Sequence, residues 1–216
     1  MRRLLFALTI LGLAIGSGPG RASELSDLED PKVQYEMGMS HLTGQGVSKD
    51  PAEAVVWLRK AALRGHPDAQ VQLGVCYQQG FGVERDVDQA LAWFRRAAEQ
   101  GNARGQLQVG LAYRRGAGVA PDLQQAIGYL RKAAEKGHPK AQVELATAYR
   151  NGQGVERDLE QAAFWLSLAN EKGSPAARVM LPGIRNQLSD AQRSEVDERV
   201  AAWKRDHPAA AAPPGS

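Results

Sequence analysis

The sequence predicts an all-α fold built as a solenoid, because a glycine pair recurs along the chain at a fixed interval of 36 residues. Columns of valine, aspartate, alanine and an aromatic residue recur in the same register. A fixed period of this length is typical of a stacked repeat array, in which each unit packs only on its neighbours and the array offers a long binding surface. The four glycine pairs are Gly44-x-Gly46, Gly80-x-Gly82, Gly116-x-Gly118 and Gly152-x-Gly154.

One helix of each repeat is predicted to begin at the recurring aspartate. In the first repeat, Asp50 is followed three residues later by Glu53, so the two side chains can form a capping box with backbone donors. Pro51 fits the first helical position, where its missing N–H is not needed. The equivalent pairs are Asp86 and Gln89, Asp122 and Gln125, and Asp158 and Gln161. A glycine at position 65, 101, 137 or 173 is predicted to end each of these helices.

The other helix of each repeat is predicted to begin near Pro31, Pro67, Asn102, Pro139 and Pro175 and to run to the next glycine pair. Gly38, Gly74 and Gly110 fall inside these helices, where glycine costs roughly 1 kcal/mol relative to alanine. We expect a neighbouring helix to approach closely at these positions. Ala146, which is also small, occupies the same column.

These columns resemble the unit of the Sel1-like repeat, a relative of the tetratricopeptide repeat. Its pattern is approximately A-x-x-x-L-G-x-x-Y-x-x-G-x-G-V-x-x-D-x-x-x-A-x-x-W-x-x-x-A-A-x-x-G. The resemblance implies antiparallel helix pairs stacked into a right-handed α/α superhelix whose first helices line a concave face. The residues that match in one continuous stretch are Ala69, Leu73, Gly74, Tyr77, Gly80, Gly82, Val83, Asp86, Ala90, Trp93, Ala97, Ala98 and Gly101.

The N-terminus resembles a signal peptide. Arg2 and Arg3 precede an apolar run from Leu4 to Ile15, and Gly20-Arg21-Ala22 offers small residues where a signal peptidase acts. The run is shorter than the roughly 20 residues that cross a bilayer. We therefore expect residues 1–22 to be removed after export, which places the protein in the periplasm or, alternatively, outside the cell.

Cleavage changes the charge balance. The full chain has 27 basic and 24 acidic residues and a formal net charge of +3. Removal of Arg2, Arg3 and Arg21 leaves 24 of each. The mature chain then lacks the strongly basic balance of a nucleic-acid-binding domain, so nucleic acid is not an expected partner.

The remaining boundaries follow from the repeat register. We expect a linker over residues 23–30, four repeats over 31–174, and a helix of a partial fifth repeat over 175–187. Ser189 and Gln192 can cap a last helix over 188–206, whose Val196, Val200 and Trp203 share one side. The tail over 207–216, rich in alanine and proline, is expected to be disordered.

A candidate partner-binding groove follows from helical spacing. When Val109 and Tyr113 are placed in the core, the opposite side of their helix carries apolar residues flanked by cations, and the same columns recur in the neighbouring repeats. One hypothesis is a concave groove that binds an acidic segment of a partner protein. The alternative is that the apolar columns pack on neighbouring repeats and the arginines are merely solvated. The groove residues are Tyr35, Val71, Val75, Arg104, Leu107, Leu111, Arg114, Arg115, Lys140, Thr147 and Arg150.

The sequence gives little support for a catalytic or metal-binding site. Cys76 is the only cysteine, so no internal disulfide can form, and its column otherwise holds small residues, which indicates a packed thiol. His66 and His138 stand just before helices and are interpreted as end residues. No histidine has a neighbouring cluster at metal spacing. We therefore expect no metal site, no cofactor and no catalytic residue.

Three functions remain open. The sequence favours a non-catalytic scaffold or adaptor of the bacterial cell envelope that binds proteins through its concave face. A second possibility is a protein that binds or hydrolyses cell-wall compounds or β-lactams, because cysteine-rich relatives are linked to that chemistry. This chain lacks their cysteine pairs. A third is a periplasmic regulator of a membrane signalling protein.

Overall fold

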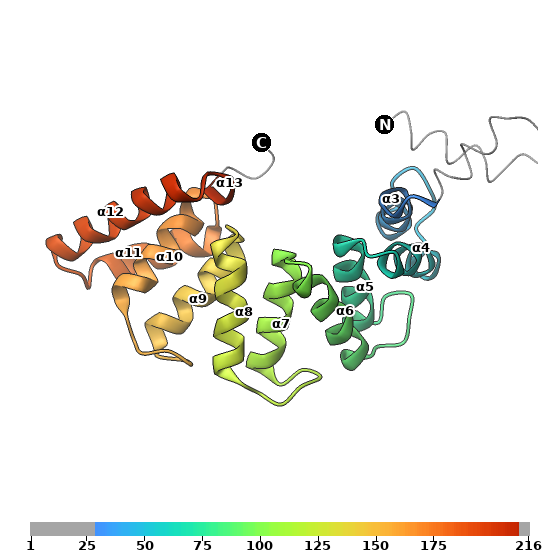
Figure 1. Cartoon of the computed structure of the whole chain (residues 1–216), viewed down its shortest axis with the longest axis horizontal. Coiled ribbons are helices and arrows are strands. Elements are labelled where there is room, and N and C mark those ends of the chain that lie inside the picture. The colour runs from blue at the N-terminus through green and yellow to red at the C-terminus, as the bar shows by residue number, and fades with distance from the viewer. Residues whose placement is uncertain (1–28, 212–216) are drawn as a thin grey trace, which may run out of the picture. The chain divides into compact units, whose positions relative to one another are not determined.

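The computed structural model describes residues 29–211, and every regular element in this range is an α-helix. The predicted signal peptide and most of the predicted linker lie outside the described residues, as do residues 212–216. Figure 1 shows the helices in chain order. They are α3 (Pro31–Thr43), α4 (Pro51–Leu63), α5 (Pro67–Gln79), α6 (Val87–Glu99), α7 (Ala103–Arg115), α8 (Leu123–Glu135), α9 (Pro139–Asn151), α10 (Leu159–Glu171), α11 (Pro175–Arg185), α12 (Asp190–Asp206) and α13 (Pro208–Ala211).

The chain divides into two compact units, Met1–Arg96 and Ala97–Ser216. In the first unit, α4 packs against α3 and α5. In the second unit, α8 packs against α7 and α9, and α10 packs against α9, α11 and α12. Within each unit these helices thus pack on helices that are close to them along the chain, as expected for a repeat array.

The predicted helix starts are present, but the reciprocal half of the predicted capping boxes is not. The backbone N–H of Asp50 donates to the His41 carbonyl at 2.9 Å, and not to Glu53. Asp50 Oδ1 accepts hydrogen bonds from the backbone N–H groups of Ala52 and Glu53, at 3.0 and 3.1 Å. Asp122 and Asp158 cap α8 and α10 in the same way, each at 2.9 Å. The alternate helices begin at His66, Asn102, His138 and Ser174, whose side chains accept a bond from the backbone three residues later. Both histidines are therefore end residues, as predicted.

The first glycine of each recurring pair ends a helix. Gly80 has a φ of 76°, and its N–H donates to the Cys76 carbonyl at 2.8 Å. This left-handed conformation carries no steric penalty for glycine, which explains why the column holds no other residue.

Close helix contacts lie at the glycines inside helices, as predicted. A Cβ at Gly74 would lie 2.6 Å from a ring carbon of Phe94, and one at Gly110 would lie 2.9 Å from Leu130 Cγ. In the first repeat, Gly38 faces Leu58 in the same manner, at 2.7 Å. Ala146 is fully buried at the equivalent position. A small residue on one helix thus receives a large apolar side chain from the next, and we call this recurring contact the repeat seam.

Helix α12 covers the last repeat. Val196 and Val200 of α12 are buried within an apolar cluster that also contains residues of α10. Arg185 donates to both carboxylate oxygens of Asp197, at 2.7 and 2.8 Å, which joins α11 to α12. Lys204 lies 2.8 Å from Glu171 of α10. The capping box predicted at Ser189 and Gln192 is complete.

The stretch predicted as a disordered tail begins with a short helix. His207 stacks on Trp203 with ring centroids 4.7 Å apart, and α13 follows at once. The Ala210 carbonyl lies against Gly137, where a side chain would not fit. Residues 207–211 are therefore ordered by contacts that the composition of the tail did not indicate.

We predict opposite effects for two glycine-to-alanine substitutions in the second unit. Alanine favours a helix by about 1 kcal/mol, but overpacking a core costs roughly 1–3 kcal/mol. Gly110→Ala should therefore lower the free energy of unfolding by about 1 kcal/mol. Gly128→Ala should raise it by up to about 1 kcal/mol, because Gly128 is exposed within α8 and has no neighbouring atom within 4 Å. Urea unfolding of both variants measures this, and stabilisation by Gly110→Ala would contradict the repeat seam.

Candidate protein-interaction surface

The apolar floor of the predicted groove is closed. Leu107 and Leu111 of α7 are each 4% exposed and belong to the apolar cluster that also contains Leu130 and Leu145. Val71 of α5 is completely buried. These three side chains are therefore packing residues and are not available to a partner. For these three residues the groove hypothesis is wrong, and the alternative, in which apolar columns pack on neighbouring repeats, is correct.

Arg114 is not a free rim residue either. Its guanidinium lies 2.5 Å from the Glu144 carboxylate, and both side chains are largely covered. Arg114 belongs to α7 and Glu144 to α9, so the ion pair joins two successive repeats. Glu144 falls between the columns assigned to the predicted groove, so this ion pair was not expected from the sequence.

The remaining cations of these two helices stay accessible. Arg104, Arg115 and Lys140 are exposed, Arg150 is half-buried, and Arg150 Nε donates to Asn151 at 3.1 Å. Helices α7 and α9 together carry five cations and one acid, Glu144, which is already paired with Arg114. We call Arg104, Arg115, Lys140 and Arg150 the basic face. Thr147 is half-buried on α9, and its hydroxyl donates to the Val143 carbonyl.

The corresponding helices of the first unit are not basic. Helix α3 carries Lys32 and Glu36, and α5 carries only Asp68. Tyr35 stacks on His66 with ring centroids 4.8 Å apart, and Val75 is half-buried. The predicted basic rim is therefore confined to the second unit, because the charge of this column changes from repeat to repeat.

His138 lies among cations at the edge of the second unit. Burial lowers its pKa most, and the positive charges of Arg104, Lys140 and Lys172 lower it further. Its Nδ1 accepts the N–H of Ala141, which requires an unprotonated nitrogen. The ring is therefore held neutral as the cap of α9, and its surroundings favour anions.

A second column of basic residues was not predicted from the sequence. Cations lie over aromatic rings one helical turn earlier: Lys60 over Trp57, Arg96 over Trp93 and Lys132 over Tyr129. The preceding residue donates to a tyrosine hydroxyl in two repeats, from Arg59 to Tyr77 at 2.8 Å and from Arg131 to Tyr149 at 3.0 Å. The recurrence of adjacent cations at 59–60, 95–96 and 131–132 was the available signal.

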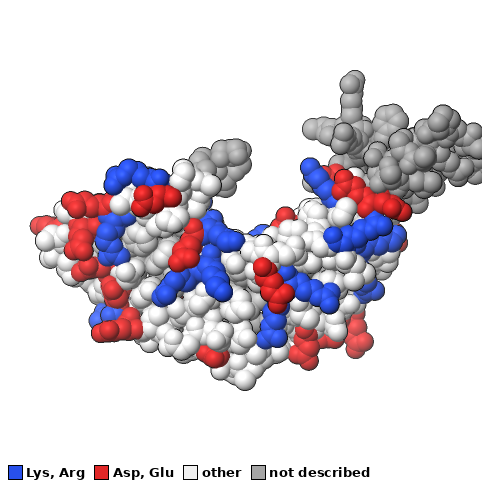
Figure 2. Space-filling model, viewed as in Figure 1, with Lys and Arg blue, Asp and Glu red and all other residues white. Residues whose placement is uncertain are grey.

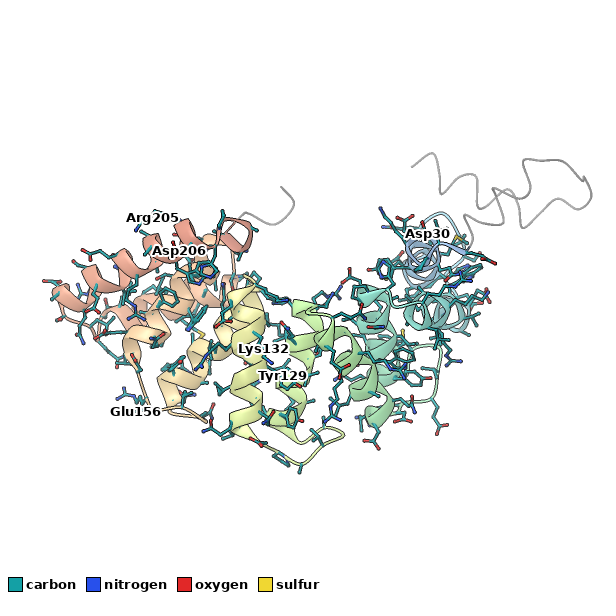
Figure 3. All side chains as sticks on the ribbon, in the orientation of Figure 1. Asp30, Tyr129, Lys132, Glu156, Arg205 and Asp206 are labelled. Carbon is teal, nitrogen blue, oxygen red and sulfur yellow. The ribbon has the colours of Figure 1, made fainter. Side chains whose placement is uncertain are left out.

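Figure 2 shows Lys and Arg side chains gathered over α8 and the neighbouring α9. Figure 3 shows Tyr129 and Lys132 side by side in this part of the molecule. The ring beneath Lys132 holds the ammonium group in place while leaving it exposed. The positive surface of the second unit therefore includes α8 as well as α7 and α9.

A buried glutamine column was also missed. Gln70, Gln106 and Gln142 are each at most 5% exposed, and each donates its side-chain amide to a carbonyl eight residues earlier. The acceptors are Ala62, Ala98 and Ala134, near the ends of the preceding helices. These bonds fix adjacent helices at a set distance, so the column is structural.

The single thiol is packed and unreactive. Cys76 is 1% exposed, and burial raises its pKa to about 11. The thiolate, which is the reactive form, is therefore scarce at neutral pH.

Neither a metal cluster nor a membrane-spanning helix is found between residues 29 and 211. Within that range no three of the side chains of His, Cys, Asp and Glu group so that they could hold an ion. No helix there is both long enough and apolar enough to cross a bilayer.

The helix pairs match the model of the Sel1 repeat in four consecutive segments, residues 31–66, 67–102, 103–138 and 139–174. The chain therefore belongs to the Sel1 repeat family, and the predicted all-α solenoid of Sel1-like repeats is confirmed. Sel1 repeats generally mediate protein–protein interactions, and proteins of this family are typically non-catalytic scaffolds.

Two solved structures resemble the chain. A Sel1 repeat protein from Oxalobacter formigenes is 36% identical over 71% of this chain and 63% of that chain, with a TM-score of 0.69. The protein c5321, a protective antigen present in uropathogenic Escherichia coli strains and displaying an SLR fold, is 27% identical. That match covers 87% of this chain and 48% of that chain, with a TM-score of 0.59. The chain thus spans less than two thirds of either protein. Among curated proteins, none shows significant similarity to it.

Proposed function

We propose that this protein is an exported, non-catalytic scaffold of the bacterial cell envelope that binds an acidic segment of a partner protein. The basic face on α7 and α9 is the surface that receives the segment. This proposal is more specific than the general role of Sel1 repeats in protein–protein interaction, because it states the charge of the partner and the surface that binds it.

The charge of α7 and α9 carries the proposal. Five cations face one acid on these two helices, and that acid is paired with Arg114. Arg104 and Lys140 occupy the same column in successive repeats, so they lie on neighbouring helices at the same level. An extended or helical acidic segment that crosses the two helices would meet several cations in succession. Complementary charge of this kind sets specificity and speeds association.

The buried floor limits the mode of binding. Because Leu107 and Leu111 are packed, the partner cannot insert a large apolar residue between them. Recognition rests instead on charged and polar contacts across an exposed surface. Such contacts are individually weak, and salt screens them.

We predict that a glutamate-rich peptide of about 15 residues binds the protein at low salt and that Arg115→Glu with Arg150→Glu weakens this binding by about tenfold, since two attractive charges become repulsive. Fluorescence anisotropy of a labelled peptide measures the affinity. The matched control is Arg178→Glu with Arg205→Glu, which makes the same change in net charge on α11 and α12. Equal loss in both double variants would show an effect of net charge alone and discard the basic face.

Export is supported by the sequence of residues 1–22. Two arginines precede a twelve-residue apolar run, and small residues stand at the expected cleavage position. Removal of this segment would leave a mature chain with equal numbers of acidic and basic residues. The basic face would then be a local feature of an otherwise balanced protein.

We predict that the mature protein begins at Ser23 and is recovered in the periplasmic fraction. Ala22→Trp should leave a precursor that is 22 residues longer, because signal peptidase requires a small residue at that position. Intact-mass measurement after osmotic shock tests both statements. Recovery of the wild-type chain in the cytoplasm with residues 2–22 intact would contradict export.

A further inference from the structure

A second surface feature lies away from the basic face. A pocket of about 800 Å³ opens at the beginning of α10 in the second unit. Its walls include the turn after α9 with Glu156, which Figure 3 labels, and the first residues of α10, Asp158, Leu159 and Glu160. Gln187 and Leu188, just before α12, and Gln192 in its first turn also line the pocket, together with Gln124 and Tyr149. We call it the C-terminal pocket.

The repeat explains where this pocket lies. In two repeats, the second glycine of the recurring pair lies directly against the first residue of an earlier helix. A Cβ at Gly154 would lie 2.7 Å from the carbonyl oxygen of Leu123, the first residue of α8. A Cβ at Gly82 would collide with the carbonyl group of Pro51, the first residue of α4. The first residue of such a helix therefore packs directly against the backbone of a turn, and only glycine fits at the point of contact.

Helix α10 begins at the equivalent position but receives no such turn. Leu159 stands 36 residues after Leu123 and is likewise the first residue of its helix. The residue 36 positions after Gly154 is Asp190, which has a side chain and begins α12 instead. The close approach made by Gly154 is closed to Asp190 for steric reasons. Helix α12 begins here instead, and Gln192 of its first turn donates to Glu160 of α10. The C-terminal pocket lies between the start of α10 and this segment, which does not form a glycine turn.

The lining of the pocket adds a preference for charge. Glu156, Asp158 and Glu160 contribute three carboxylates, against one cation, Arg157. Asp158 accepts the N–H of Gln161 as the cap of α10, and Glu160 accepts a bond from Gln192 at 2.6 Å. Arg157 Nε donates to the Arg150 carbonyl at 3.2 Å. The net negative charge favours a cationic residue in whatever enters.

We propose that the C-terminal pocket binds a glycine-containing turn of a partner protein that carries a lysine or arginine three residues after the glycine. This goes beyond the proposed function, because it is a separate surface with the opposite preference in charge. The turns of this chain show the required composition. Residues 152–157, with the sequence Gly-Gln-Gly-Val-Glu-Arg, pack at the equivalent position on α8.

The test uses the full mature chain and a synthetic peptide with the sequence of residues 150–158. We expect binding with a dissociation constant on the order of 1 mM, since a short flexible peptide loses much conformational freedom. In an NMR titration, the shifted amide signals should be those of Leu159, Glu160, Gln187 and Leu188. A peptide with alanine in place of the second glycine should bind at least about tenfold more weakly, since its Cβ meets the backbone of α10.

A pair of protein variants provides the second arm. Glu156→Lys should weaken binding of the peptide by a few-fold through loss of a carboxylate. Glu84→Lys is the matched control, because Glu84 occupies the same position in an earlier turn and should leave binding unchanged.

Three outcomes would overturn the proposal. These are equal binding of the alanine peptide, shifts located on α7 and α9, or an equal effect of both lysine variants. Sedimentation velocity should show that the chain alone is a monomer. A dimer that the peptide dissociates would assign the pocket to a second copy of the chain instead. None of these results bears on binding of the glutamate-rich peptide, so the two proposals fail independently.

Discussion

The structure depends on the close approach of helices at the repeat seam. Gly38, Gly74 and Gly110 lack the side chain that would keep the helices apart, and a large apolar residue from the next helix fills the space. Ala146, which has only a methyl side chain, is fully buried in the same column. Protein interiors are packed so tightly that one added methyl group is felt. The seam therefore fixes how the helices stack within each unit. The buried glutamines add directional bonds between the same layers.

This constraint decides which residues remain for function. Apolar residues of α7 such as Leu107 and Leu111 are buried in the core and are therefore not available to a partner. The exposed side chains of α7 and α9 are polar, and most of them are cations. The proposed binding surface therefore consists of residues that helix stacking leaves exposed, and its charge determines which partner it would bind. At the last repeat, where no further glycine turn follows, stacking leaves a pocket as well.

The periodic features could be predicted from the sequence, whereas contacts between different columns could not. Caps such as Asp50 and turns such as Gly80 depend on a few adjacent residues, so their patterns were sufficient. The close contacts at the glycines inside helices could also be predicted, because glycine destabilises a helix and a close helix contact compensates for that loss. The Arg114–Glu144 pair, the glutamine bonds and the order of α13 depend on which side chains meet across elements. Helical spacing predicts a face, but it does not predict whether a neighbouring helix covers that face.

A double-mutant cycle at Gly110 and Leu130 tests the repeat seam most directly. If a Cβ at position 110 is destabilising because it meets Leu130, then Gly110→Ala should cost much less when Leu130 has been replaced by alanine. We expect a coupling energy of about 1 kcal/mol or more between the two substitutions, measured by urea unfolding of the four proteins. Costs that add to within about 0.3 kcal/mol would show that the two positions do not interact, and would contradict it.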